Sequence, residues 1–152
     1  MVQIELRGMQ VKDVVDVAYI DQLCNVSAWT EPLFLQELEL PYSIHLVALV
    51  EHKIVGFVIA WALHDILQIL ELAVDPSFRR QGIASKLLVE LFDIARQKQC
   101  KTAELELREN NAIARQLYRN LGFKAVGKRA QFYHNPDGSR TDAILMNYTI
   151  CH

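Results

Sequence analysis

Long hydrophobic runs, an excess of charge of either sign, and an abundance of glycine or proline are all missing from this sequence. Only six glycines and four prolines occur, against 51% hydrophobic and 22% charged residues, which excludes collagen-like, low-complexity and disordered chains. The net charge of -2, from 16 basic and 18 acidic residues, excludes attraction to nucleic acid or anionic membranes through bulk positive charge. We therefore expect a folded chain that binds neither nucleic acid nor membrane directly, and in which any basic site is local.

Membrane-spanning segments and cysteine pairs are also missing. The longest apolar run, residues 54–63, is too short to cross a bilayer, and the first residues lack the apolar region of a signal peptide. Cys24, Cys100 and Cys151 are scattered, without the close spacing that zinc or a redox dithiol requires, and the histidines occur singly. We expect a cytoplasmic protein with free thiols and no metal.

Hydrophobic periodicity predicts an alternation of strands and helices in one domain that spans residues 1–152, because no linker or repeat divides the chain. The clearest helix has apolar residues at 83, 84, 87, 88, 91, 92 and 95, a broad stripe that suits packing against a sheet. Strands are predicted near residues 2–6, 44–50, 54–63, 66–74, 102–107, 123–133 and 141–150, and helices near 11–18, 30–40 with Thr30 as N-cap, 83–95 and 111–121.

This order of elements predicts an α/β (α+β) fold, in which a mixed sheet carries helices on its faces. The strand, long helix and strand in the middle of the chain predict a right-handed parallel crossover. Ligands of such sheets bind beyond the carboxyl end of the strand that feeds the helix. We therefore expect the functional site around residues 71–85.

The segment that leaves this strand and enters the long helix contains the pattern Arg79-x-x-Gly82-x-Ala84. Gly82 allows close approach of the backbone to a ligand, and the first N–H groups of the helix have no intrahelical acceptors. Together with the positive end of the helix dipole they predict a site for a pyrophosphate. A solvated loop in which the glycine serves only the turn explains the pattern equally well when it is taken alone.

The wider pattern resembles the GNAT acetyltransferases, whose Arg/Gln-x-x-Gly-x-Gly/Ala motif binds the pyrophosphate of acetyl-CoA. Asp75-Pro76, Asn110-Asn111-Ala112 and the segment 117–123 follow the order and spacing of that family. Within it the chain is most similar to the ribosomal-protein alanine N-acetyltransferases, the RimI group. The resemblance covers nearly the whole chain, and further matching segments are Trp29-Thr30, 105–111 and 142–146.

The resemblance implies a GNAT fold, with a central, mixed, mostly antiparallel sheet splayed between the strands at 66–74 and 102–107, and helices on both faces. It places the acyl group of acetyl-CoA, the co-substrate, in that opening. Asn111 takes the position of a side chain that contacts acetyl-CoA. Backbone groups of Leu72, Ala73 and Val74 would hold the pantetheine arm, and the pyrophosphate loop would comprise Arg79, Arg80, Gln81, Gly82, Ile83, Ala84 and Ser85.

By the same resemblance, Glu106 is expected to act as general base and Tyr118 as general acid. Taken from the sequence alone, Glu106 is one of several solvated carboxylates on its strand, and Tyr118 is a packing residue at the edge of an apolar stripe. Proton transfer from a phenol of pKa about 10 to a thiolate of pKa about 8.5 is only modestly uphill. The acid role is therefore chemically reasonable.

The expected reaction is transfer of acetyl from acetyl-CoA to a protein N-terminal amine, with the N-terminal alanine of a small-subunit ribosomal protein as the acceptor that the resemblance implies. An α-amine of pKa about 8 is roughly one-tenth neutral at pH 7, whereas a lysine is almost wholly charged, so direct attack by an N-terminus requires less of its base. The acceptor is expected near residues 29–35 and 133–142. Two alternatives remain: a GNAT acting on a small amine, antibiotic or lysine side chain, and a non-catalytic acyl-CoA sensor.

Overall fold

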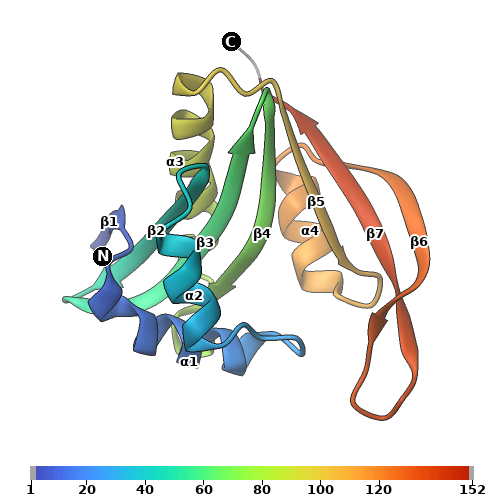
Figure 1. Ribbon diagram of the computed structural model, residues 1–152, viewed down its shortest axis with the longest axis horizontal. Helices are drawn as coiled ribbons and strands as arrows, with labels where there is room; N and C mark the ends of the chain where they lie inside the picture. The colour runs from blue at the N-terminus through green and yellow to red at the C-terminus, as the bar shows by residue number, and fades with distance from the viewer. Residues whose placement is uncertain (1–2, 151–152) are drawn as a thin grey trace.

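The computed structural model describes residues 3–150, which form a seven-stranded sheet with helices packed on both of its faces (Figure 1). Helices α1 and α2 lie on one face, and α3 and α4 lie on the other. The strands are β1 (Ile4–Gly8), β2 (Ser43–Val50), β3 (Lys53–Leu63), β4 (Ile66–Val74), β5 (Thr102–Arg108), β6 (Lys124–His134) and β7 (Arg140–Thr149), and the helices are α1 (Val14–Cys24), α2 (Glu31–Leu38), α3 (Ile83–Gln97) and α4 (Ala112–Asn120).

The predicted order of strands and helices is confirmed, with boundaries that differ by a few residues. The first strand begins at Ile4, and its predicted start at Val2 lies outside the described residues. The prediction for Thr30 is wrong in one respect: it occupies the N-cap position of α2, but its side chain makes no capping hydrogen bond. None of the helices among residues 3–150 is long and apolar enough to cross a membrane.

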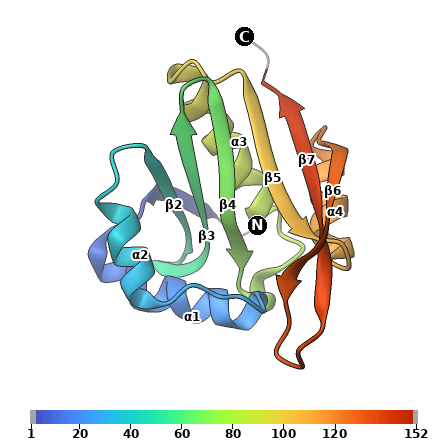
Figure 2. The ribbon, with the colours of Figure 1, turned by 45° about the vertical axis from the view of Figure 1, so that its right-hand side comes forward.

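The sheet has the strand order β1-β2-β3-β4-β5-β7-β6. All neighbouring strands are antiparallel except β4 and β5, which are parallel and are joined through α3. Only Ile66–Gln68 of β4 pairs with Thr102–Glu104 of β5. Beyond that point the two strands diverge, so that the sheet opens like a wedge towards their carboxyl ends (Figure 2). The predicted mixed, splayed sheet is therefore confirmed.

A β-bulge in β4 lies where the wedge opens. Ala60 of β3 pairs with Ile69 and Ile59 pairs with Glu71, so Leu70 is an extra residue without a direct partner. The extra residue reverses the alternation of side chains along the strand. Ile69 and Leu72 therefore face the same core, although their positions differ by three, which in a regular strand would place them on opposite faces.

Two hydrophobic cores hold the β1–β4 part of the sheet from both sides. The predicted stripe of α3 is confirmed, because Leu87, Leu88, Leu91 and Phe92 are buried against one face. The opposite core contains residues of α1 together with Phe34 of α2. Burial of each large apolar side chain contributes about 1.5–3 kcal/mol. These packed layers fix β4 and the start of α3, between which the site is built.

Candidate active site

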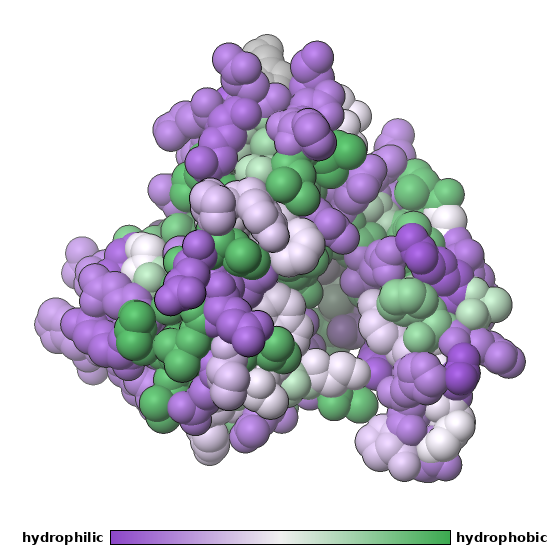
Figure 3. Space-filling view, viewed as in Figure 1, coloured by the Kyte–Doolittle hydropathy of each residue, from purple (hydrophilic) through white to green (hydrophobic). Residues whose placement is uncertain are grey.

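Two pockets meet inside the opening of the sheet, which appears as a hollow between the two parts of the molecule in Figure 3. The nest pocket, of about 700 Å³, lies at the start of α3 and is lined by residues 24, 25, 72–74, 78–80, 82–85, 111, 113, 114, 117 and 118. The wedge pocket, of about 560 Å³, lies between β4 and β5 and is lined by residues 24–27, 29, 69–72, 105–108, 110, 111, 114, 118 and 133.

The nest pocket is built largely from main chain. Arg80 (φ 65°) and Gly82 (φ 76°) are both in the left-handed region, which turns the backbone into the first turn of α3. The N–H groups of that turn have no intrahelical acceptors, and they carry the positive end of the helix dipole. A Cβ atom added to Gly82 would meet no atom within 4 Å, so the space beside the glycine is open to a ligand. This geometry suits a pyrophosphate.

The structure brings most of the predicted donor-binding residues together. The members that line the nest pocket are Leu72, Ala73, Val74, Arg79, Arg80, Gly82, Ile83, Ala84, Ser85 and Asn111, whereas Gln81 is exposed and does not line it. No strand pairs with the β5-facing edge of β4 beyond Gln68, so backbone groups there are available to an extended ligand. Asn111 also caps α4, because its Oδ1 accepts a hydrogen bond from the N–H of Ala114 at 3.1 Å.

Tyr118 lies where the two pockets meet, because it lines both of them. Its side chain is 6% exposed, and its ring packs edge-on against Phe123 with centroids 5.3 Å apart. Burial, and to a lesser degree the charge of Glu71, raises the pKa of Tyr118. The hydroxyl therefore stays protonated at neutral pH, as a proton donor must before it acts.

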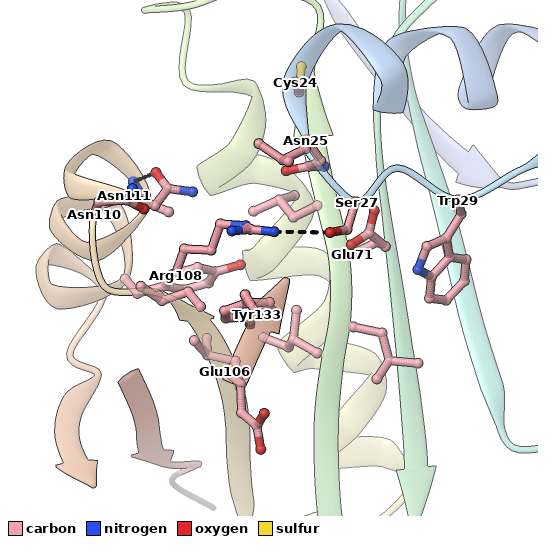
Figure 4. Close-up of a pocket in the computed structure, with 18 residues that line it drawn as sticks. Cys24, Asn25, Ser27, Trp29, Glu71, Glu106, Arg108, Asn110, Asn111 and Tyr133 are labelled. Atoms are coloured by element: carbon pink, nitrogen blue, oxygen red, sulfur yellow. Dashed lines mark hydrogen bonds between the residues drawn. The ribbon is translucent and has the colours of Figure 1, made fainter. Parts of the chain in front are cut away.

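Glu106 of β5 is one of the residues that line the wedge pocket. Its side chain is 26% exposed, and its Oε1 lies 3.1 Å from Nη2 of Arg129 on β6. The carboxylate points away from Arg108 and Tyr133 (Figure 4). The structure thus places Glu106 and Tyr118 around one pocket, on separate elements, and the roles that we expect for them stay predictions.

Arg108, at the end of β5, links the three segments around the outer end of the wedge pocket (Figure 4). Its Nη1 donates to Oδ1 of Asn135 at 2.6 Å, and its Nη2 donates to Oγ of Ser27 at 3.0 Å and to the carbonyl of His134 at 3.3 Å. The guanidinium also lies over the ring of Tyr133, 4.6 Å from its centroid. One side chain therefore joins β5 to the loop between α1 and α2 and to the β6–β7 hairpin.

Two buried carboxyl groups that the sequence analysis did not single out also belong to this region. Asp21 of α1 is fully buried and accepts hydrogen bonds from Nδ2 of Asn25 and, at 2.8 Å, from the N–H of Trp29. Glu71 of β4 lines the wedge pocket, and its Oε2 is shielded from solvent and has no hydrogen-bond partner. Burial, followed by the neighbouring carboxyl of Asp21, raises the pKa of Glu71 to about 10. The sequence signal that could have identified Glu71 is its position as the single carboxylate in the otherwise mainly apolar strand 66–74.

Metal binding has no visible site in the described part of the chain. Among residues 3–150, no three side chains of His, Cys, Asp or Glu are grouped so that they could hold an ion.

Cys24, which lies between the two pockets, has a thiol whose pKa is raised by burial, and that thiol donates to the carbonyl of Val74 at 3.3 Å.

Comparison with known proteins identifies the family. Residues 14–123 match the model of the acetyltransferase (GNAT) family. The chain is 35% identical over 127 residues to the [ribosomal protein bS18]-alanine N-acetyltransferase of Haemophilus ducreyi, which covers 84% of this chain and 87% of that protein. It is 30% identical over 141 residues to the enzyme of the same name from Escherichia coli K12, with 93% and 94% covered.

The fold gives the same result. The crystal structure of the ribosomal-protein-S18-alanine N-acetyltransferase from Escherichia coli superimposes with a TM-score of 0.89 at 29% identity, covering 99% of this chain and 96% of that one. The family uses acetyl-CoA as its acyl donor, and the nest pocket has the anion-binding geometry that this donor needs. The predicted resemblance is thereby confirmed: the chain belongs to the GNAT family of acetyltransferases.

Proposed function

We propose that this protein transfers acetyl from acetyl-CoA to the N-terminal alanine of ribosomal protein bS18. The observation that carries the proposal is the meeting of the nest pocket and the wedge pocket at Tyr118, which joins a site for the donor to a chamber for an amine. The acceptor is inferred from the relatives named above, whose likeness extends over most of the chain.

The donor would lie along the nest pocket. N–H groups at the start of α3, with Arg79 and Arg80 beside them, would hold the pyrophosphate, and the free edge of β4 would hold the pantetheine arm as an added strand. Asn111 would contact the donor from the start of α4. These contacts would direct the thioester towards Tyr118.

The acceptor amine would attack the thioester carbonyl directly, so that the C–N bond forms as the C–S bond breaks. Glu106, acting directly or through a water, would take the proton that the amine loses. Tyr118 would donate its proton to the departing thiolate and regain one from solvent. Because burial raises the pKa of Tyr118, its first contribution would be a hydrogen bond to the developing thiolate, with full transfer as CoA leaves.

Thiol release from acetyl-CoA tests the proposal with a panel of acceptors: a peptide carrying the N-terminal sequence of bS18, the same peptide with its N-terminus acetylated, a blocked peptide with an internal lysine, and spermidine. Release with the free peptide alone is expected. Release with the blocked lysine peptide or spermidine would instead favour a GNAT of other specificity. Binding of acetyl-CoA without turnover on any acceptor would favour an acyl-CoA sensor.

A further inference from the structure

The carboxyl pair of Glu71 and Asp21 has no role in the reaction described above, although Glu71 lines the wedge pocket. The bulge at Leu70 turns Glu71 towards the face of the sheet that α1 covers, where Asp21 projects from that helix. The two carboxyl groups lie within hydrogen-bonding reach of each other. Two side chains from elements far apart in the sequence thus converge at the wall of the pocket.

The hydrogen bonds of Asp21 indicate which carboxyl group carries a proton. Both oxygens of Asp21 already accept hydrogen bonds, from Asn25 and from the backbone of Trp29. Glu71 lacks such donors at its Oε2, which is buried without a partner, so its charged form is the less stabilised of the two. A proton on Glu71, shared with Asp21, satisfies this arrangement, because two adjacent buried carboxylates cannot both be charged at low cost.

The pair has no cationic partner in the described part of the chain, because neither carboxyl group forms an ion pair with an arginine or lysine there. Arg108, the arginine of the wedge pocket, is held by Asn135 and Ser27, and Figure 4 shows it across the pocket from Glu71. The titratable and charged groups around Glu71 are Asp21 and Cys24 from α1, Tyr118 from α4, Tyr133 from β6, and Glu106 and Arg108 from β5.

We propose that Glu71, supported by Asp21, binds the α-ammonium group of the acceptor and positions it for attack. This inference rests on the proposed function. On binding, the proton shared by the two carboxyl groups leaves to solvent, and the ammonium replaces it as hydrogen-bond donor and positive charge. The bound ammonium later loses one proton to Glu106 or its water, and the neutral amine attacks. Glu71 thus selects a cationic amine through the part of its carboxyl group that lines the wedge pocket.

The first test measures binding to the complex with CoA, which has no acetyl group and allows no turnover. Calorimetry compares the bS18 peptide with an analogue in which a propionyl group replaces the N-terminal alanyl residue, so that only the ammonium is missing. The wild-type protein is expected to bind the ammonium peptide tenfold to a hundredfold more tightly, as for a hydrogen-bonded buried charge. In Glu71→Gln this preference is expected to vanish, whereas Glu104→Gln, an exposed carboxylate on the same face, retains it.

The second test counts the protons that are released when the peptide binds. At pH 6 the α-amine is charged, so titrations in buffers of different ionisation enthalpy are expected to show about one proton released per ammonium peptide bound, and none for the propionyl analogue. Glu71→Gln is expected to release none. Equal preference for the two peptides in the wild type, or an unchanged preference in Glu71→Gln, would overturn the inference, as would binding of the ammonium peptide to the wild type without proton release.

Activity separates this inference from the proposed function. If the wild-type protein releases no thiol with the bS18 peptide, the proposed acceptor is wrong. If it does acetylate the peptide but Glu71→Gln leaves the KM for the peptide unchanged, the acceptor stands and the role of Glu71 is wrong. We expect the KM of Glu71→Gln for the peptide to rise at high and at low pH alike. The KM of Glu104→Gln is expected to stay at the wild-type value.

Discussion

The nest pocket and the wedge pocket share six lining residues, among them Tyr118 and Asn111, but are built in different ways. The nest pocket is formed mainly by one continuous segment, residues 72–85, and its polar groups belong largely to the backbone. The wedge pocket is formed by side chains from α1, the following loop, β4, β5, α4 and β6. Under the proposed function, recognition of the donor would therefore depend on local backbone geometry, whereas recognition of the acceptor would depend on tertiary assembly.

The largest effect is expected where the two pockets meet. Tyr118→Phe removes a hydroxyl but keeps the ring that packs against Phe123. We expect kcat to fall by about a hundredfold to a thousandfold, because proton donation to the leaving thiolate is lost, while the Kd for acetyl-CoA stays within about twofold. Steady-state thiol release and calorimetry measure the two quantities.

Tyr148→Phe is the matched control for this variant. Tyr148 stacks on Phe92 and Phe123 in the same aromatic cluster, with centroids 5.4 and 5.3 Å away, but it lines neither pocket. Its hydroxyl should therefore be dispensable for turnover. Equal losses of kcat in the two variants would show that packing, and not proton donation, explains the effect of Tyr118.

The two pockets should also differ in how they affect the pH dependence of stability. The wedge pocket contains a buried carboxyl group, that of Glu71, in an unfavourable environment. The pKa of Glu71 is about 10 in the folded protein, against an ordinary value of 4.5. The folded state therefore keeps a proton that the unfolded state loses, and stability falls as pH rises above about 4.5. Glu71→Gln removes this penalty and should gain up to about 3 kcal/mol at pH 7, with little change at pH 4.

Urea unfolding of Glu71→Gln and the wild type at pH 4 and pH 7 measures this difference. If the free energies of unfolding of Glu71→Gln and the wild type differ by the same amount at pH 4 and at pH 7, Glu71 is charged in the folded protein at pH 7. Such a result would also contradict the shared proton that we infer for the carboxyl pair. If Glu71→Gln is more stable than the wild type but binds the peptide less tightly, Glu71 serves function at a cost in stability.

Two glycines allow the nest pocket to be tested with matched backbone strain. Gly82 (φ 76°) and Gly138 (φ 88°) both occupy the left-handed region, and a Cβ on either would meet nothing within 4 Å. Replacement of either by alanine should cost about 1 kcal/mol of folding free energy. Gly82→Ala should also weaken CoA binding by about tenfold, as the amides shift, whereas Gly138→Ala should not; equal CoA affinities would contradict the anion nest.

The parts of the structure that the sequence could predict are those that short-range patterns determine. Apolar spacing between residues 83 and 95 was enough to predict α3, and the pattern from Arg79 to Ala84 was enough to predict a backbone nest at its start, where the anion itself stays a prediction. Both features depend on neighbours in the chain. The prediction that Thr30 caps α2 with its side chain was wrong. The side chain of an N-cap threonine can either bond to the helix or turn away from it, and local sequence does not decide between the two.

The remaining features depend on contacts between distant segments. The bulge at Leu70 follows from the register between β3 and β4, which no local pattern encodes. Glu71 and Asp21 are separated by 50 positions, and Arg108 and Ser27 by 81, so these pairs become visible only once the sheet has formed. The acceptor side of the molecule was accordingly the less predictable one.

The smallest effect is expected at the link between Arg108 and Ser27, which holds the loop between α1 and α2 against β5. Ser27→Ala removes this exposed hydrogen bond but leaves Arg108 bound to Asn135 and the carbonyl of His134. Since one such bond contributes about 0.5–1.5 kcal/mol, the KM for the peptide should rise by about twofold to tenfold. The KM for acetyl-CoA should not change, because Ser27 lines the wedge pocket but not the nest pocket. A parallel rise in both constants would show that the loop supports the two pockets together, and the contrast between them would then be weaker than their lining residues indicate.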